Sequence, residues 1–100
     1  MNVMAFKLLT GEEIIAELVE STGQGYKIKT PLVVHVVRDQ GGPALAFARW
    51  SFVQKEGEVI HLYEHSIVSA PVEVTDDVSD TYTSQVTGLV LPKQGIVLQG

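Results

Sequence analysis

The chain has 100 residues, which is the size of a single domain with a thin core. It contains no cysteine, and this excludes disulfides, thiolate metal sites and cysteine nucleophiles. Seven basic and twelve acidic residues give a net charge of −5, which argues against unspecific coating of DNA or RNA.

Turn signals at short intervals divide the chain into apolar segments of strand length, which is typical of an all-β domain. The first two expected strands, residues 3–9 and 13–20, are joined by a turn at Thr10-Gly11-Glu12. The second strand alternates, with Ile14, Ala16 and Leu18 on one face and Ile15, Glu17 and Val19 on the other. Two glycines and small polar residues then predict a loop at residues 21–25.

The third expected strand, residues 26–37, is the longest. Its first half alternates between apolar and basic side chains, in the order Tyr26, Lys27, Ile28 and Lys29. Pro31 cannot donate to a central ladder, so it predicts a bulge or an unpaired edge. A long strand that bends strongly at such a point is how a small barrel turns a corner.

Two more strands are expected after a turn at residues 38–43. The fourth covers residues 44–53, and the fifth covers residues 58–68 with an extension at 72–74. A tight turn, Lys55-Glu56-Gly57, separates them. The aromatic residues of this region are expected in the barrel core or at a subunit interface, with a base-stacking platform as the weaker alternative: Phe47, Trp50 and Phe52.

The C-terminal part, residues 75–100, changes character. An apolar spacing of four predicts one face of a short helix, formed by Val78, Tyr82 and Val86. Thr75 and the following aspartates can cap its start, and Gly88 can end it. Residues 89–91 and 96–98 are expected to be short extended pieces. Because 45% of the chain is apolar, we expect this tail to pack on the barrel of residues 1–74 or on a neighbouring subunit of a homo-oligomer.

No pattern in the sequence indicates an enzyme, a cofactor or a metal ion, because nucleophile, phosphate-loop and calcium-loop motifs are all missing. On one strand His61 and His65 would lie roughly 13 Å apart, too far to share a metal. His35 is interpreted as a core or interface residue. Residues 1–5 lack the pattern of a signal peptide, and no segment is apolar enough for a membrane helix. We therefore expect a cytoplasmic protein, in the host cytoplasm if it is viral, without membrane contact.

The opening Leu8-Leu9-Thr10-Gly11-Glu12 is similar to the Leu-Lys-Asp/Asn-Gly-Arg/Glu motif of Sm-like proteins, the family of Sm proteins and bacterial Hfq. The resemblance covers residues 3–74. It implies a five-stranded, strongly bent antiparallel barrel, and a ring in which strands four and five of adjacent subunits pair. The chain also resembles small proteins encoded by tailed phages of marine cyanobacteria, which share the Leu-Leu-Thr-Gly-Glu opening, a Tyr/Ile-x-Pro strand and a tail with Tyr-x3-Gly. This second resemblance implies Sm-like architecture and ring assembly, not an activity.

The same resemblance implies an RNA site, with departures from the family pattern. Tyr26 would stack on a base, and Lys27 replaces the asparagine that the family uses beside it. The family's Ile-Arg-Gly motif has two alternative counterparts. If the fourth strand is 44–53, Lys55 takes the place of the arginine; if it is 59–63, Tyr63-Glu64-His65 lies there. The candidate nucleic-acid-binding residues are Tyr26, Lys27, Lys29 and Lys55.

Two functions remain open at this point. One is an Sm-like ring that binds RNA. The other is a non-enzymatic structural or protein-interaction module of phage origin that does not bind nucleic acid. The acidic charge and the missing Arg-Gly pair favour the second, and the aromatic and basic residues beside the loop at 21–25 favour the first.

Overall fold

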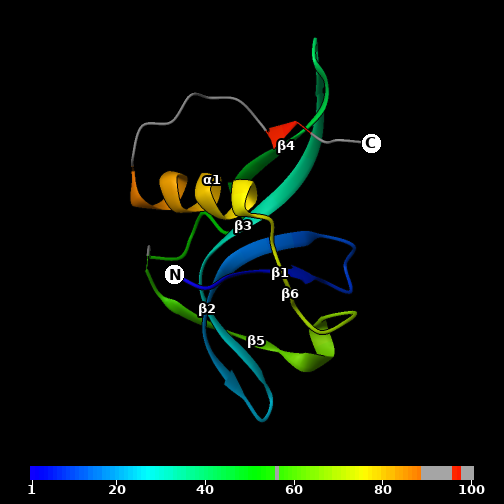
Figure 1. Ribbon diagram of the computed structural model, residues 1–100. Helices are drawn as coiled ribbons and strands as arrows, with labels where there is room; N and C mark the ends of the chain where they lie inside the picture. The colour runs from blue at the N-terminus through cyan, green and yellow to red at the C-terminus, as the bar shows by residue number, and fades with distance from the viewer. Residues whose placement is uncertain (56, 89–95, 98–100) are drawn as a thin grey trace.

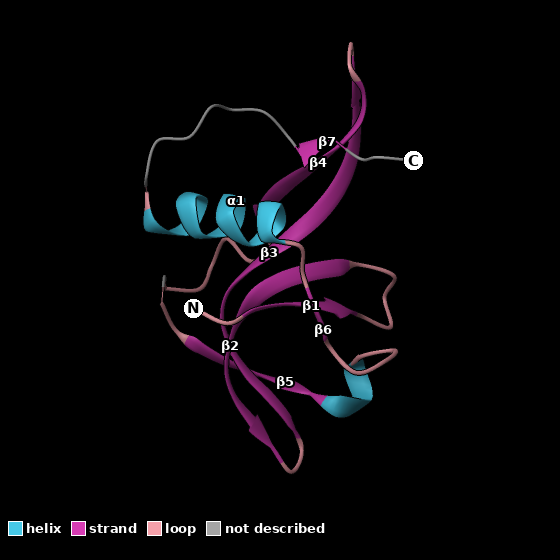
Figure 2. Ribbon diagram, in the orientation of Figure 1, coloured by secondary structure: helices cyan, strands magenta, loops and turns pink. Residues whose placement is uncertain are grey.

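The computed structural model describes residues 1–55, 57–88 and 96–97. In this part a curled antiparallel β-sheet carries one α-helix on its outer face (Figures 1 and 2). The prediction of a mainly β domain is therefore confirmed. The elements are, in chain order, β1 (Val3–Lys7), β2 (Glu13–Thr22), β3 (Gly25–Asp39), β4 (Gly42–Arg49), β5 (Val59–Tyr63), the 3₁₀ turn η1 (Glu64–Ser66), β6 (Val72–Glu73), α1 (Asp76–Thr87) and β7 (Ile96–Val97).

The strands follow the order β6-β1-β2-β3-β4-β7, and β5 also pairs with β3. One edge of β3 pairs with β2. The other edge pairs with β5 along its first part and with β4 along its second part. Therefore β4 and β5 run one after the other along a single edge, and the described residues between them, 50–55 and 57–58, lie outside the sheet.

The chain returns to β1 after η1. Ile67 forms a bridge with Leu8, and the Val68 N–H donates to the Lys7 carbonyl oxygen over 2.8 Å. β6 then pairs with β1. The sheet thus curls back toward its first strand, but β5 and β6 do not pair with each other in the described residues.

The bend of β3 lies at Thr30 and Pro31, as the proline predicted. The ladder with β2 pairs Ile15 with Leu32 and Glu17 with Lys29, so β3 holds one extra residue there. Thr30 takes the left-handed conformation, with φ of 50°. This conformation lets the strand change direction, and its second half continues into the long hairpin with β4 that extends away from the body in Figure 1.

The inner core lies inside the curl of the sheet. It contains the alternate residues of β1 and β2 that face inward, and those of β3 and β5 opposite them: Phe6, Leu8, Ile14, Ala16, Ile28, Val33 and Leu62. The sequence pattern placed Ile14, Ala16 and Leu18 on one face, and all three belong to this core or pack against it. The sheet can therefore bury one apolar face without the helix.

A second core lies between the outer face of the sheet and α1. The buried ring of Tyr82 packs there with Val3, Ile15 and Leu32. The helix begins as predicted, because the Thr75 hydroxyl oxygen accepts a hydrogen bond from the Val78 N–H over 3.4 Å. It ends at Gly88, whose φ of 76° is left-handed. The predicted helix and its buried face are confirmed.

Three expected strands are shorter than the sequence indicated. β1 ends at Lys7, β4 ends at Arg49, and β5 ends at Tyr63 because the chain must turn through η1 to reach β1. Consequently Trp50 and Phe52 lie outside the fourth strand. Trp50 packs partly against the inner core, whereas Phe52 is 75% exposed.

Other expectations concern the hairpin and the tail. His35 is exposed, so of its two interpretations the core position is wrong and the interface position stays a prediction. Of the two extended pieces expected in the tail, residues 89–91 lie outside the described residues. Ile96 and Val97 form β7 and pair with Leu45 and Ala44 of β4.

Candidate functional site

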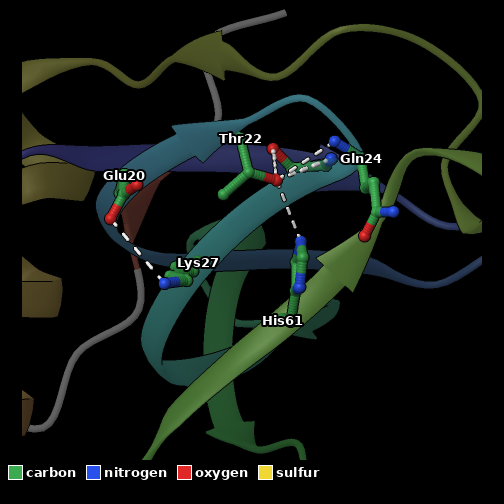
Figure 3. Close-up of polar contacts among 6 residues, drawn as sticks. Glu20, Thr22, Gln24, Lys27 and His61 are labelled. Atoms are coloured by element: carbon green, nitrogen blue, oxygen red, sulfur yellow. Dashed lines mark hydrogen bonds and ion pairs between the residues drawn. The ribbon is translucent and has the colours of Figure 1, made fainter.

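The β2–β3 hairpin and the end of β5 are joined by a polar centre at Thr22. Its hydroxyl oxygen accepts from the backbone N–H groups of Gln24, over 3.2 Å, and Gly25, over 3.0 Å. The same hydroxyl lies 3.0 Å from Nε2 of His61 (Figure 3). The hydroxyl also donates to the Gly25 carbonyl oxygen over 3.2 Å, so it has two donors and one acceptor within its own turn. The contact with His61 joins this turn to β5.

Gly25 allows the hairpin to approach β5 closely. Its residue is buried, and a Cβ atom at this position would overlap the Leu62 carbonyl oxygen and lie 2.9 Å from Cα of Tyr63. One residue earlier, the Gln24 carbonyl oxygen accepts a hydrogen bond from the Glu64 N–H over 2.9 Å. The hairpin tip and the start of η1 are therefore held together by their backbones.

A stack of three planar rings lies on β5 and η1. The Tyr63 ring is 4.4 Å from the His61 ring, with an interplanar angle of 27°. On its other side it is 5.7 Å from the His65 ring, with an angle of 12°. We call these three residues the ring stack. Tyr63 is 46% exposed, so the stack offers planar surface to a ligand or to another protein.

The charges named around the ring stack are one cation and two anions. The Lys27 ammonium lies 3.8 Å from a carboxylate oxygen of Glu20 on the neighbouring strand (Figure 3). Glu64 is exposed next to the stack. Both members of the ion pair are largely solvated, so the pair contributes little to stability. It does, however, leave this surface without excess positive charge.

The residues predicted from the sequence as a nucleic-acid site do not form one surface. Tyr26 is half-buried against the inner core, where its ring makes an edge contact with Phe6 at 5.8 Å. Lys27 and Lys29 lie on the opposite face of β3. Lys55 lies in the 50–58 segment, where it lines a cavity that none of the other three lines.

The ring stack was not among those four residues, but the sequence contains its signal. Positions 61, 63 and 65 alternate and so fall on one side of an extended segment. Of the two alternatives for the second family motif, Tyr63-Glu64-His65 is the one that contacts the hairpin. The sequence does not decide between the two alternatives, because the fourth strand is interrupted between Arg49 and Val59.

Within residues 1–55, 57–88 and 96–97, no three histidine or acidic side chains converge as a metal site requires. No helix in these residues has the length and apolar character needed to cross a bilayer. No protein-family model matches the chain, and no curated protein matches it significantly.

Proposed function

We propose that this protein is a non-enzymatic assembly module, an Sm-like barrel whose copies join edge to edge in a ring. The observation that carries the proposal is the presence of two open strand edges. In the described residues β5 pairs only with β3, and β6 pairs only with β1. An unpaired strand edge is a template for another strand, and proteins cover or block such edges unless they use them.

Apolar side chains flank both open edges. Val59 at the start of β5 and Val72 in β6 are exposed, and so is Val68 between η1 and β6. Charged side chains usually protect an open edge from unwanted pairing. β5 contains no acidic residue, lysine or arginine, and β6 contains Glu73 alone. Burial of these valines in a partner would add an apolar contribution of about 25 cal/mol per Å² to the backbone hydrogen bonds.

Pairing β5 of one copy with β6 of the next is a head-to-tail contact, which closes into a ring when the rotation allows. The strand order supports the Sm-like assignment. If β4 and β5 count as one fourth strand interrupted by residues 50–58, β6 becomes the fifth strand. The contact is then the pairing of strands four and five that the family resemblance implies.

The test is the oligomeric state of the purified chain, measured by light scattering and native mass spectrometry. A Val59→Lys substitution at the β5 edge is expected to shift the assembly to monomer. Val19→Lys is the matched control, because Val19 is 46% exposed and Val59 is 47% exposed, but Val19 lies on the central strand β2. A wild-type chain that stays monomeric, or a Val59→Lys variant that still assembles, would contradict the proposal.

RNA binding is a second candidate function, and the ring stack is the observation that favours it. Stacking of a base on an aromatic side chain contributes roughly 1–3 kcal/mol per base. Against it stand the net charge of −5 and the pairing of Lys27 with Glu20. Anisotropy with short oligo(U) and oligo(A), at low and high salt, tests it. Tyr63→Ala is expected to abolish any binding, and a ring that ignores both oligonucleotides at low salt would refute it.

A further inference from the structure

A cavity of about 350 Å³ lies on the side of the molecule where residues 50–58 leave the sheet. Its walls come from the bend of β3, the end of β4, the start of β5 and the last turn of α1. This volume falls within the range of small-molecule sites, which are mostly apolar with a few convergent polar groups. The ring stack and the open strand edges do not contribute to it.

The apolar part of the cavity is formed by Pro31, Leu32, Ile60 and Val86. These residues belong to elements that are fixed to one another. The Trp50 N–H donates to the Pro31 carbonyl oxygen over 3.3 Å, which ties the 50–58 segment to the bend of β3. The cavity is therefore built into the fold.

The helix is tied to the opposite wall. The Gln85 side-chain amide, which also lines the cavity, donates to the Phe47 carbonyl oxygen of β4 over 3.2 Å. Thr30 lines the cavity in its left-handed conformation. Left-handed non-glycine residues persist where the surroundings enforce them, and they concentrate at functional sites.

Among the described residues, two cations and one anion line the cavity. Arg49 and Lys55 line it together with Glu58. The Arg49 guanidinium carbon lies 5.6 Å from the centre of the Phe52 ring, a cation–π distance that holds this side chain at the rim. In the described residues the only ion pair is that of Lys27 and Glu20, so neither cation of the cavity is paired with a carboxylate there.

We propose that this cavity binds a small molecule that has an apolar body and a single anionic group. The apolar walls receive the body, and Arg49 and Lys55 receive the anionic group. A polyphosphate fits less well, because it would place several negative charges beside Glu58. The proposal does not depend on ring assembly, since every wall belongs to one copy of the chain.

Anilinonaphthalene sulfonate is a suitable probe, because it combines an aromatic body with one sulfonate, and phenylnaphthylamine is its neutral counterpart. Trp50 is the only tryptophan and lies between two residues that line the cavity, so its fluorescence reports binding to the unmodified chain. Calorimetry gives the number of molecules bound. We expect one sulfonate per chain and quenching of Trp50. Several weak sites, or binding without a change in Trp50 fluorescence, would overturn the proposal.

Variants separate the cavity from the rest of the surface. Arg49→Gln and Lys55→Gln are each expected to weaken sulfonate binding about three- to fivefold and to leave the neutral probe unchanged. Ser51→Phe, which fills the cavity, is expected to abolish binding of both probes. The controls are Arg38→Gln, an exposed arginine in the β3–β4 hairpin, and Val53→Ser, an exposed apolar residue outside the cavity lining.

Both controls are expected to bind like the wild type. If both glutamine variants bind the sulfonate as tightly as the wild type, the proposal is wrong. It is also wrong if Arg38→Gln weakens binding as much as they do, because net charge alone would then explain the effect. Circular dichroism confirms that each variant is folded, and the two glutamine variants decide the matter if Ser51→Phe does not fold.

Discussion

The hydroxyl group of Tyr82 forms hydrogen bonds with backbone groups of the sheet at the bend of β3, and its removal is expected to destabilise the fold. The extra residue of β3 at the bend leaves backbone groups that no strand partner can pair. The Tyr82 hydroxyl accepts from the Glu17 N–H over 3.1 Å and lies 2.8 Å from the Thr30 carbonyl oxygen and 3.1 Å from that of Lys29. Its one proton goes to Thr30, the closer acceptor. Tyr82→Phe therefore leaves a donor and an acceptor of two half-buried residues, Glu17 and Thr30, without this partner.

The expected cost follows from these two groups. The net contribution of one hydrogen bond to the free energy of unfolding is about 0.5–1.5 kcal/mol, and a buried polar group left without a partner lowers that free energy by about 1–3 kcal/mol. Because the Tyr82 side chain is fully buried, water cannot replace the hydroxyl without rearrangement. We expect Tyr82→Phe to lower the free energy of unfolding by about 2–4 kcal/mol, a large part of the roughly 5–15 kcal/mol of a whole domain.

Urea unfolding, followed by far-ultraviolet circular dichroism, measures this loss, and thermal unfolding should show Tm lower by roughly 10–20 °C. Tyr26→Phe is the matched control. Its ring also packs on a core, but its hydroxyl makes no hydrogen bond within the described residues, so we expect a change below about 0.5 kcal/mol. If Tyr82→Phe is no less stable than Tyr26→Phe, the hydroxyl does not hold the bend.

Three further predictions follow from the same structure. Burial raises the pKa of Tyr82 from 10.0 to about 12, so the neutral phenol stabilises the folded state fully below pH 10, and this stabilisation is lost as the pH rises to 12. Urea titrations of the wild type should show the free energy of unfolding fall by about 2–3 kcal/mol over this range, and those of Tyr82→Phe should not. Gly25→Ala forces a Cβ atom into the backbone of β5 and should cost about 1–3 kcal/mol, whereas Gly23→Ala, with nothing within 4 Å, should be nearly neutral in the same assay. Thr75→Ala removes the helix cap and should lower Tm by an amount equivalent to about 1 kcal/mol; an unchanged Tm would show that the 3.4 Å bond contributes nothing.

The fold was predictable where the sequence carries a local signal. The alternation in residues 13–20 placed Ile14, Ala16 and Leu18 on the face of the inner core and Ile15 on the opposite face, and Pro31 located the bend of β3. Thr75 and Gly88 located both ends of α1. Each of these signals acts through a residue's own backbone chemistry or through a period of two or four, so no tertiary information is required.

The candidate site was less predictable, because it depends on which segments meet. The interruption at residues 50–58 hides the fact that β5 continues the edge that β4 began. That Tyr26 and Lys27 face opposite sides of β3 follows from the alternation in residues 26–29, but the place of Lys55 on the far side of the interruption does not. Neither composition nor spacing says that Tyr82, far along the chain, supplies the hydroxyl for a defect between β2 and β3.

The bend at Thr30 links the features that distinguish this domain from a plain curled sheet. A strand that changes direction there needs a polar group to pair its freed carbonyl, and Tyr82 of α1 supplies it. The same bend separates β4 from β5 along one edge, so the intervening residues leave the sheet and, with the last turn of α1, enclose the cavity. The first half of β3 pairs with β5, which places the β2–β3 hairpin beside the ring stack. The helix and the cavity thus meet the sheet at this one bend, where the hydrogen bonds of Tyr82 join α1 to the backbone of β2 and β3.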